Sequence, residues 1–142
     1  MIERVKTLIV EDNAADIELL KIAFAKNEID TEIIVKTDGE AAIDYLLKLK
    51  KRCTPIAFPK LVILDLNLPK RSGKEVLEVI KRDCVLKRLP VIIMSTSDVS
   101  EEIESCYELH SNAYLVKPND FNHFLSLVQS IKDFWYERNK QF

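Results

Sequence analysis

Glycine is scarce in this chain, and its scarcity argues against a nucleotide-binding loop. The 142 residues include two glycines, Gly39 and Gly73. Neither belongs to a G-x-G-x-x-G run or a Walker-type loop, in which several glycines let the backbone approach phosphates. Each of the two is therefore expected at a backbone position that specifically needs a residue without a side chain.

Paired cysteines and cysteine clusters are also missing. The three cysteines, Cys53, Cys84 and Cys106, are an odd number, form no C-x-x-C motif and are accompanied by only two histidines. A disulfide framework or a structural zinc site would need closer and more regular spacing. We expect free, reduced thiols.

Long apolar runs and an excess of one charge are absent as well. No run approaches the roughly 18 residues that a membrane span needs, and residues 1–4 lead into a short strand pattern rather than a signal peptide. Twenty-one basic and twenty-three acidic residues give a net charge of −2, so no basic surface for nucleic acid is evident. We expect a cytoplasmic protein that binds neither membranes nor nucleic acid.

Short apolar runs alternate along the chain with longer segments of helical period. This alternation is typical of βαβ units around a parallel sheet, so the fold class is α/β. Stripes of apolar residues at helical spacing predict five helices between and after the strands, with Ser100 as the N-cap of the fourth. The expected strands are Val5–Val10, Glu32–Lys36, Leu61–Leu66, Val91–Ser95 and Ala113–Val116.

Polar residues stand where four of the predicted strands end. They are Glu11-Asp12, Asp65, Ser95 and Lys117. Ligands of open parallel sheets bind outside the carboxyl ends of the strands, so these side chains should share one edge. Asp65 follows the apolar run 61–64, where a charged group is costly unless it has a partner.

Carboxylates that cluster in this way repel one another, and a hard divalent cation removes that cost. We predict that Asp12 and Asp65 ligate Mg²⁺ and that Glu11 acts through a bound water. An oxygen of Asp65 could then attack a phosphoryl group. Lys117 and the hydroxyl of Ser95 would neutralise the oxygens of the transition state.

The ordered set of these motifs resembles the receiver domain of bacterial response regulators. The motifs are Glu11-Asp12, the turn 38–42, Asp65-Leu66-Asn67-Leu68-Pro69 with Gly73, Ser95, and Lys117-Pro118. The resemblance covers nearly the whole chain. It implies a flavodoxin-like, doubly wound sheet of five parallel strands in the order 2-1-3-4-5, with five helices.

The resemblance also implies a role for each site residue. Asp65 would accept a phosphoryl group from the phosphohistidine of a sensor histidine kinase, and the backbone carbonyl of Asn67 would join Mg²⁺. Lys117 would bind the phosphoryl group, while Ser95 and Tyr114 would form the conformational switch.

Three further features bear on the resemblance to this family. The bond between Lys117 and Pro118 is expected to be cis by analogy. Asn112 stands where many members have glycine, and asparagine also tolerates a left-handed backbone. The long stretch before the third strand, with the residues 65–70 and an aromatic C-terminal end, resembles the subgroup associated with phytochrome-type sensor kinases.

The chain ends at Phe142, directly after the fifth predicted helix, so we expect a single receiver domain of residues 1–142 without an output domain. Output would then go through protein contacts. The segment Phe134-Trp135-Tyr136 suggests a homodimer through the fourth and fifth strand–helix units, although these aromatics could instead cover the domain's own core.

Two other classes of function share features with this sequence. A phosphatase of the haloacid dehalogenase type needs Asp-x-Asp, but Asn67 stands at the second position and cannot shuttle a proton. We therefore expect no enzyme beyond slow self-dephosphorylation. A flavodoxin-like electron carrier lacks its phosphate-binding loop. The open alternative is a receiver-like scaffold that acts without phosphorylation.

Overall fold

The sheet has the predicted topology. The structure is a computed structural model, which describes residues 4–52 and 57–140. All strand pairs are parallel, and the order is β2-β1-β3-β4-β5. The strands are β1 (Lys6–Val10), β2 (Glu32–Lys36), β3 (Leu61–Leu64), β4 (Val91–Ser95) and β5 (Ala113–Val116). The predicted fold class is therefore confirmed.

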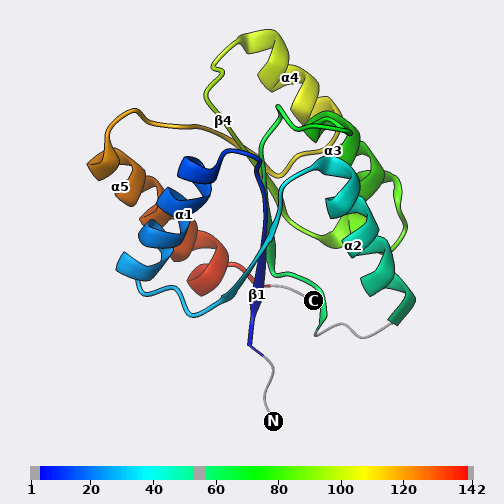
Figure 1. The fold of residues 1–142 in the computed structure, drawn as a ribbon, viewed down its shortest axis with the longest axis horizontal. Coiled ribbons are helices and arrows are strands. Elements are labelled where there is room, and N and C mark those ends of the chain that lie inside the picture. Colours follow the sequence, from blue (N-terminus) through cyan, green and yellow to red (C-terminus); the bar gives the residue numbers. More distant parts are fainter. Residues whose placement is uncertain (1–3, 53–56, 141–142) are drawn as a thin grey trace.

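Helices cover both faces of this sheet (Figure 1). Helices α1 and α5 lie on one side, and α2, α3 and α4 lie on the other. Their bounds are α1 (Ala14–Lys26), α2 (Gly39–Arg52), α3 (Gly73–Arg82), α4 (Ser100–Glu108) and α5 (Phe121–Ile131). A 3₁₀ helix, η2 (Leu86–Arg88), precedes β4, and a π-helical segment, η3 (Lys132–Arg138), continues α5.

Two apolar clusters fill the spaces between the sheet and its helices. Side chains of β1, β3 and β4 point alternately into one cluster and the other, and β3 and β4 are buried along their whole length. Burial of each large aliphatic side chain contributes about 1.5–3 kcal/mol. The central strands are thereby held rigidly, which positions the residues that follow them.

Side-chain caps define where two helices begin. The Asn13 side chain accepts from Asp16 N at the start of α1, and Ser72 does the same for Glu75 N at the start of α3. The predicted cap of α4 was wrong, because Ser100 is already the first helical residue.

Asn112 does not adopt the left-handed backbone that its position suggested. Among the described residues other than glycine, positive φ values occur at Glu28, Lys70 and His110. The Asn112 side-chain oxygen instead accepts from Val91 N (2.8 Å) and from Lys81 Nζ (2.9 Å). The amide therefore ties α3 to the start of β4, a contact that glycine could not make.

The C-terminal aromatics mainly cover the domain's own core. Tyr136 bonds through its hydroxyl to Thr7 Oγ1, and its ring packs edge-on against Phe24. Trp135 is half-buried against the same cluster, whereas Phe134 is 52% exposed. Burial raises the pKa of Tyr136 to about 12. Tyr136 and Trp135 thus pack mainly against the domain's own core.

Cys84 and Cys106 are free, as predicted, while Cys53 lies outside the described residues. Within 4–52 and 57–140, no helix is both long and apolar enough to cross a membrane.

Candidate phosphoacceptor site

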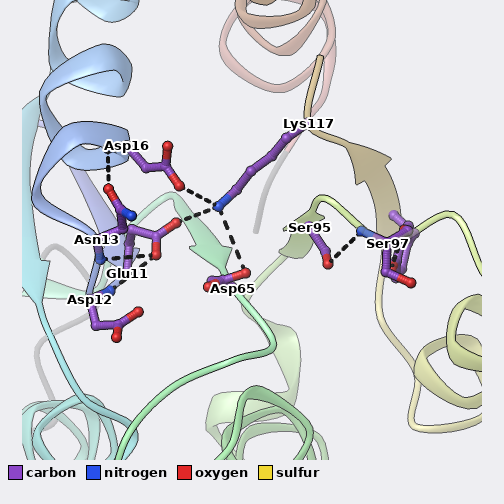
Figure 2. Close-up of polar contacts among 9 residues, drawn as sticks. Glu11, Asp12, Asn13, Asp16, Asp65, Ser95, Ser97 and Lys117 are labelled. Atoms are coloured by element: carbon purple, nitrogen blue, oxygen red, sulfur yellow. Dashed lines mark hydrogen bonds and ion pairs between the residues drawn. The ribbon is translucent and has the colours of Figure 1, made fainter. Parts of the chain in front are cut away.

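Backbone hydrogen bonds of the sheet bring the predicted site residues to one edge. Asp65 N donates to the carbonyl of Val10, the residue before Glu11 (3.0 Å). Lys117 N donates to the carbonyl of Ser95 (2.7 Å). Because the strands are parallel, the residues that follow β1, β3, β4 and β5 emerge at the same edge. Figure 2 shows them converging there.

The ammonium group of Lys117 lies at the centre of the site. Its Nζ donates to Glu11 Oε1 (2.6 Å) and to Asp16 Oδ2 (3.0 Å), and it lies 3.8 Å from Asp65 Oδ1. The side chains of Glu11, Asp65 and Lys117 are 3%, 11% and 11% exposed. Ion pairs with so little access to water are screened weakly by salt.

Three carboxylates could together hold a metal ion. One oxygen from each of Glu11, Asp12 and Asp65 lies within 4.8 Å of the others. Oxygen donors of this kind are the ligands that hard divalent cations take. With Asp16, which bonds to Lys117, the site contains four carboxylates and one ammonium, an excess of three negative charges when all are ionised. The donor set and its charge therefore fit a divalent cation.

Burial dominates the protonation of Asp65. It raises the pKa of this carboxyl from 3.8 to about 6; Lys117 opposes the change and Glu11 adds to it. Burial also lowers the pKa of Lys117, but hydrogen bonds to Glu11 and Asp16 outweigh it and raise the value overall. Lys117 is therefore charged at neutral pH, and Asp65 ionises only at the cost of folding free energy.

This cost predicts a pH-dependent gain in stability for Asp65→Asn when divalent cations are removed. Because the folded pKa lies above the unfolded one, Asp65 contributes stability below about pH 4, and that contribution is lost as the pH rises through 6. At pH 7.5 the variant should be more stable by on the order of 2 kcal/mol, and at pH 4 the two proteins should match.

Thermal unfolding with chelator at both pH values measures this difference. Asp44→Asn on the exposed face of α2 is the matched control and should change neither melting temperature by more than a degree or so. Equal gains for Asp65→Asn at pH 4 and pH 7.5 would contradict the raised pKa.

The expected switch residues, Ser95 and Tyr114, lie on the neighbouring strands β4 and β5. Ser95 is 1% exposed, and its Oγ accepts from Ser97 N (3.2 Å). Tyr114 is half-buried on β5, and its hydroxyl donates to the carbonyl of Ser97 (2.8 Å). Both side chains therefore contact the same residue of the loop between β4 and α4. A movement of Ser95 would therefore shift Ser97 and change the hydrogen bond that Tyr114 makes to it.

The loop after Asp65 is held by close backbone packing. Asn67 lies exposed within it, two residues beyond Asp65. A Cβ placed on Gly73 would lie 2.2 Å from the carbonyl oxygen of Asp65, and one on Gly39 would lie 2.0 Å from that of Arg71. Neither glycine has a positive φ, so both are needed for close approach and not for backbone conformation.

The peptide bond between Lys117 and Pro118 is trans, so the cis form expected by analogy is not found. An X-Pro bond favours trans by about 0.5–1 kcal/mol in the absence of other constraints.

Asp16 is the site residue that sequence reasoning missed. The Asn13 cap places it in the first turn of α1, where its carboxylate meets Lys117 from across the chain. The sequence did offer a signal: Asp16 is an acid four residues after Asp12, in the first turn of the helix that follows β1. Acids are common in the first turn of a helix because they interact favourably with the helix dipole, so nothing in the sequence marked Asp16 as a partner of Lys117.

A doubly wound sheet with clustered acids, a buried hydroxyl and a lysine at its carboxyl edge defines a receiver domain. The family model described as "Response regulator receiver domain" matches residues 7–129. The chain belongs to this family.

Among its relatives, the chain is similar to response regulator Rcp1 of Synechocystis sp. The two are 40% identical over 130 residues, which span 92% of this chain and 88% of Rcp1. It is 38% identical to the probable methanogenesis regulatory protein FilR2 of Methanothrix harundinacea, over 94% of this chain and 84% of FilR2.

Solved structures give the same result. The phosphorylated cyanobacterial phytochrome response regulator RcpA superposes with a TM-score of 0.88 at 37% identity, over 98% of this chain and 99% of RcpA. The Mn²⁺-bound form of Rcp1 has a TM-score of 0.85 at 38% identity, over 99% of each chain. The predicted resemblance to phytochrome-associated regulators is confirmed.

Proposed function

We propose that Asp65 accepts a phosphoryl group from the phosphohistidine of a sensor histidine kinase and that this modification switches the protein's contacts. The observation that carries the proposal is the setting of Asp65. Its nearly buried carboxylate lies 3.8 Å from the ammonium of Lys117 and shares a cluster with Glu11 and Asp12.

Asp12, Asp65 and the backbone carbonyl of Asn67 would hold Mg²⁺, with Glu11 acting through a water. Bound there, Mg²⁺ would neutralise charge on the acids and on the incoming phosphoryl oxygens. The acidic cluster supports a divalent cation, as does the Mn²⁺-bound structure of Rcp1. The preference for Mg²⁺ is part of the proposal.

In the transfer step, an oxygen of Asp65 forms a bond to phosphorus while the bond from phosphorus to the donor's imidazole nitrogen breaks. The electron pair of the broken bond stays on that nitrogen. Lys117 and the hydroxyl of Ser95 stabilise the phosphoryl oxygens, whose charge is spread in a loose transition state.

Once phosphorylated, the site would draw Ser95 toward the new dianion. Ser95 Oγ would then leave its bond with Ser97 N, and Tyr114 would lose its present place beside the same loop. Asn67 cannot act as a general base, so turnover is limited to slow self-dephosphorylation.

The test is labelling by a small acyl-phosphate donor, followed by intact mass and by mapping of the modified peptide. We expect one phosphoryl group on the peptide that contains residues 61–70, present with Mg²⁺ and absent with chelator. A folded protein that takes up no label would support the scaffold alternative.

We also propose a phytochrome-type histidine kinase as the cytoplasmic partner, with output through protein contacts. The similarity to RcpA, whose structure is described as that of a phytochrome response regulator, supports the kinase type.

A phosphorylation-sensitive homodimer through the units β4–α4 and β5–α5 is part of the same proposal. Val99, Tyr107 and Val116 lie on these units and are 56%, 49% and 41% exposed. Exposed apolar side chains on these units suit an interface between two copies.

Sedimentation at tens of micromolar, with and without an acyl-phosphate mimic, tests the homodimer. We expect a shift toward dimer with the mimic, and Val116→Asp should prevent it by placing a charge in the interface. A monomer under both conditions would remove the idea.

A further inference from the structure

Lys117 has two strong partners, and neither is Asp65. A lysine ammonium has three N–H donors. Two of them serve Glu11 (2.6 Å) and Asp16 (3.0 Å), and the distance of 3.8 Å to Asp65 is too long for a hydrogen bond. In Figure 2 the contacts to Asp16 and Asp65 leave the nitrogen in divergent directions.

Asp16 is held firmly enough to act on Lys117. Its backbone N–H is capped by the Asn13 side chain (3.1 Å), and the next residue, Ile17, anchors the turn in the core. Its carboxylate is 34% exposed, whereas Lys117 is only 11% exposed. The contact therefore restrains a buried lysine from a fixed helical turn.

Glu11 cannot provide this restraint alone. Its Oε2 already accepts from the backbone N–H groups of Asp12 (3.1 Å) and Asn13 (3.3 Å). Glu11 also faces the acid cluster, so a cation bound there would compete with Lys117 for its negative charge. Asp16 is not part of that cluster, so a cation bound there would compete less for the contact between Asp16 and Lys117.

We propose that Asp16 is a positioning residue that holds Lys117 away from Asp65, so that the oxygens of Asp65 stay open to a divalent cation and to the phosphoryl donor. This inference rests on the proposed function of the site. Without Asp16, the ammonium would close its gap to Asp65, because an ion pair with so little water around it is strongly attractive. Lys117 and the cation would then compete for the same oxygens.

A double-mutant cycle on Mg²⁺ affinity tests the inference without relying on phosphorylation. The four proteins are wild type, Asp16→Asn, Lys117→Met and the double variant, with Mg²⁺ binding followed by calorimetry. We expect Asp16→Asn to raise the Mg²⁺ dissociation constant by about threefold to tenfold, the size of a lost, partly exposed charged hydrogen bond. In the Lys117→Met background the same substitution should change it by less than about twofold.

The cycle separates positioning from a simple loss of negative charge. If charge alone mattered, Asp16→Asn would weaken Mg²⁺ binding equally in both backgrounds, and this result would overturn the inference. The inference would also be overturned if Asp16→Asn changed the Mg²⁺ affinity in neither background. Asp16→Glu should restore most of the affinity. Glu18→Gln, on the exposed side of the same helix beside Lys21, is the control and should leave the affinity unchanged.

Failure of the inference can be told apart from failure of the proposed function. If the wild-type protein takes up phosphoryl label but the double-mutant cycle shows no coupling between Asp16 and Lys117, only the role of Asp16 is overturned. Wild-type protein that takes up no label would overturn the phosphoacceptor function, whatever the cycle shows.

Discussion

An Asp65→Asn variant is expected to take up no phosphoryl group under conditions in which the wild-type protein takes up one. The amide has the shape of the carboxylate but no negative charge, so it is a poor nucleophile and a weaker ligand for a divalent cation. Lys117 keeps its hydrogen bonds to Glu11 and Asp16, so the site around the substitution should stay in place.

Intact mass after treatment with the acyl-phosphate donor and Mg²⁺ measures the result. The loss should be complete, which makes this the largest effect expected for any single substitution in the site. Asp44→Asn is the matched control, because the same chemical change on the exposed face of α2 should leave labelling intact. Label that persists in Asp65→Asn would assign the modification to another residue.

The second large effect is expected from Gly73→Ala. Its Cβ would lie 2.2 Å from the carbonyl oxygen of Asp65 and 2.6 Å from the Cα of Leu66. Both are backbone atoms, so no side-chain rotation relieves the clash. Gly73 N also donates to the carbonyl of Leu66 (2.9 Å), which closes the loop tightly. The start of α3 or the backbone of Asp65 must therefore move.

We expect Gly73→Ala to lower the free energy of unfolding by about 3 kcal/mol, at the upper end of the usual cost of overpacking. Labelling of the folded protein should fall by tenfold or more, because a displacement of about 1 Å of a reacting group can cost that much. Thermal unfolding and the labelling rate give the two values.

Gly39→Ala and Ser72→Ala are the controls for this prediction. The first introduces a comparable clash, 2.0 Å from the carbonyl oxygen of Arg71, but further from Asp65. The second removes the cap of α3 at a cost of about 1 kcal/mol. Both should be less stable yet label at rates within a few-fold of wild type. Normal stability of Gly73→Ala would show that the loop can yield.

Most of the sheet was predictable because the buried strands carry a strong local pattern. Three predicted strands agree residue for residue, and the third was expected two residues too long because Leu66 continues its apolar run. The predicted α4 cap was wrong because the helix starts one residue earlier than expected: Val99 is the N-cap residue, and no side chain caps this helix.

The sequence by itself determined the strands, their parallel arrangement and the edge at which Glu11, Asp65, Ser95 and Lys117 meet. Apolar periodicity and the polar residues after each strand are local properties, and parallel pairing brings those strand ends together.

Only the tertiary structure decided which partners these side chains choose. The contact between Asp16 and Lys117 spans 101 positions of the chain, and that between Thr7 and Tyr136 spans 129. Such long-range contacts depend on how the helices pack over the sheet and on which polar side chains become buried away from water. No local pattern carries that information, because the same residues at the same spacing could equally have faced solvent.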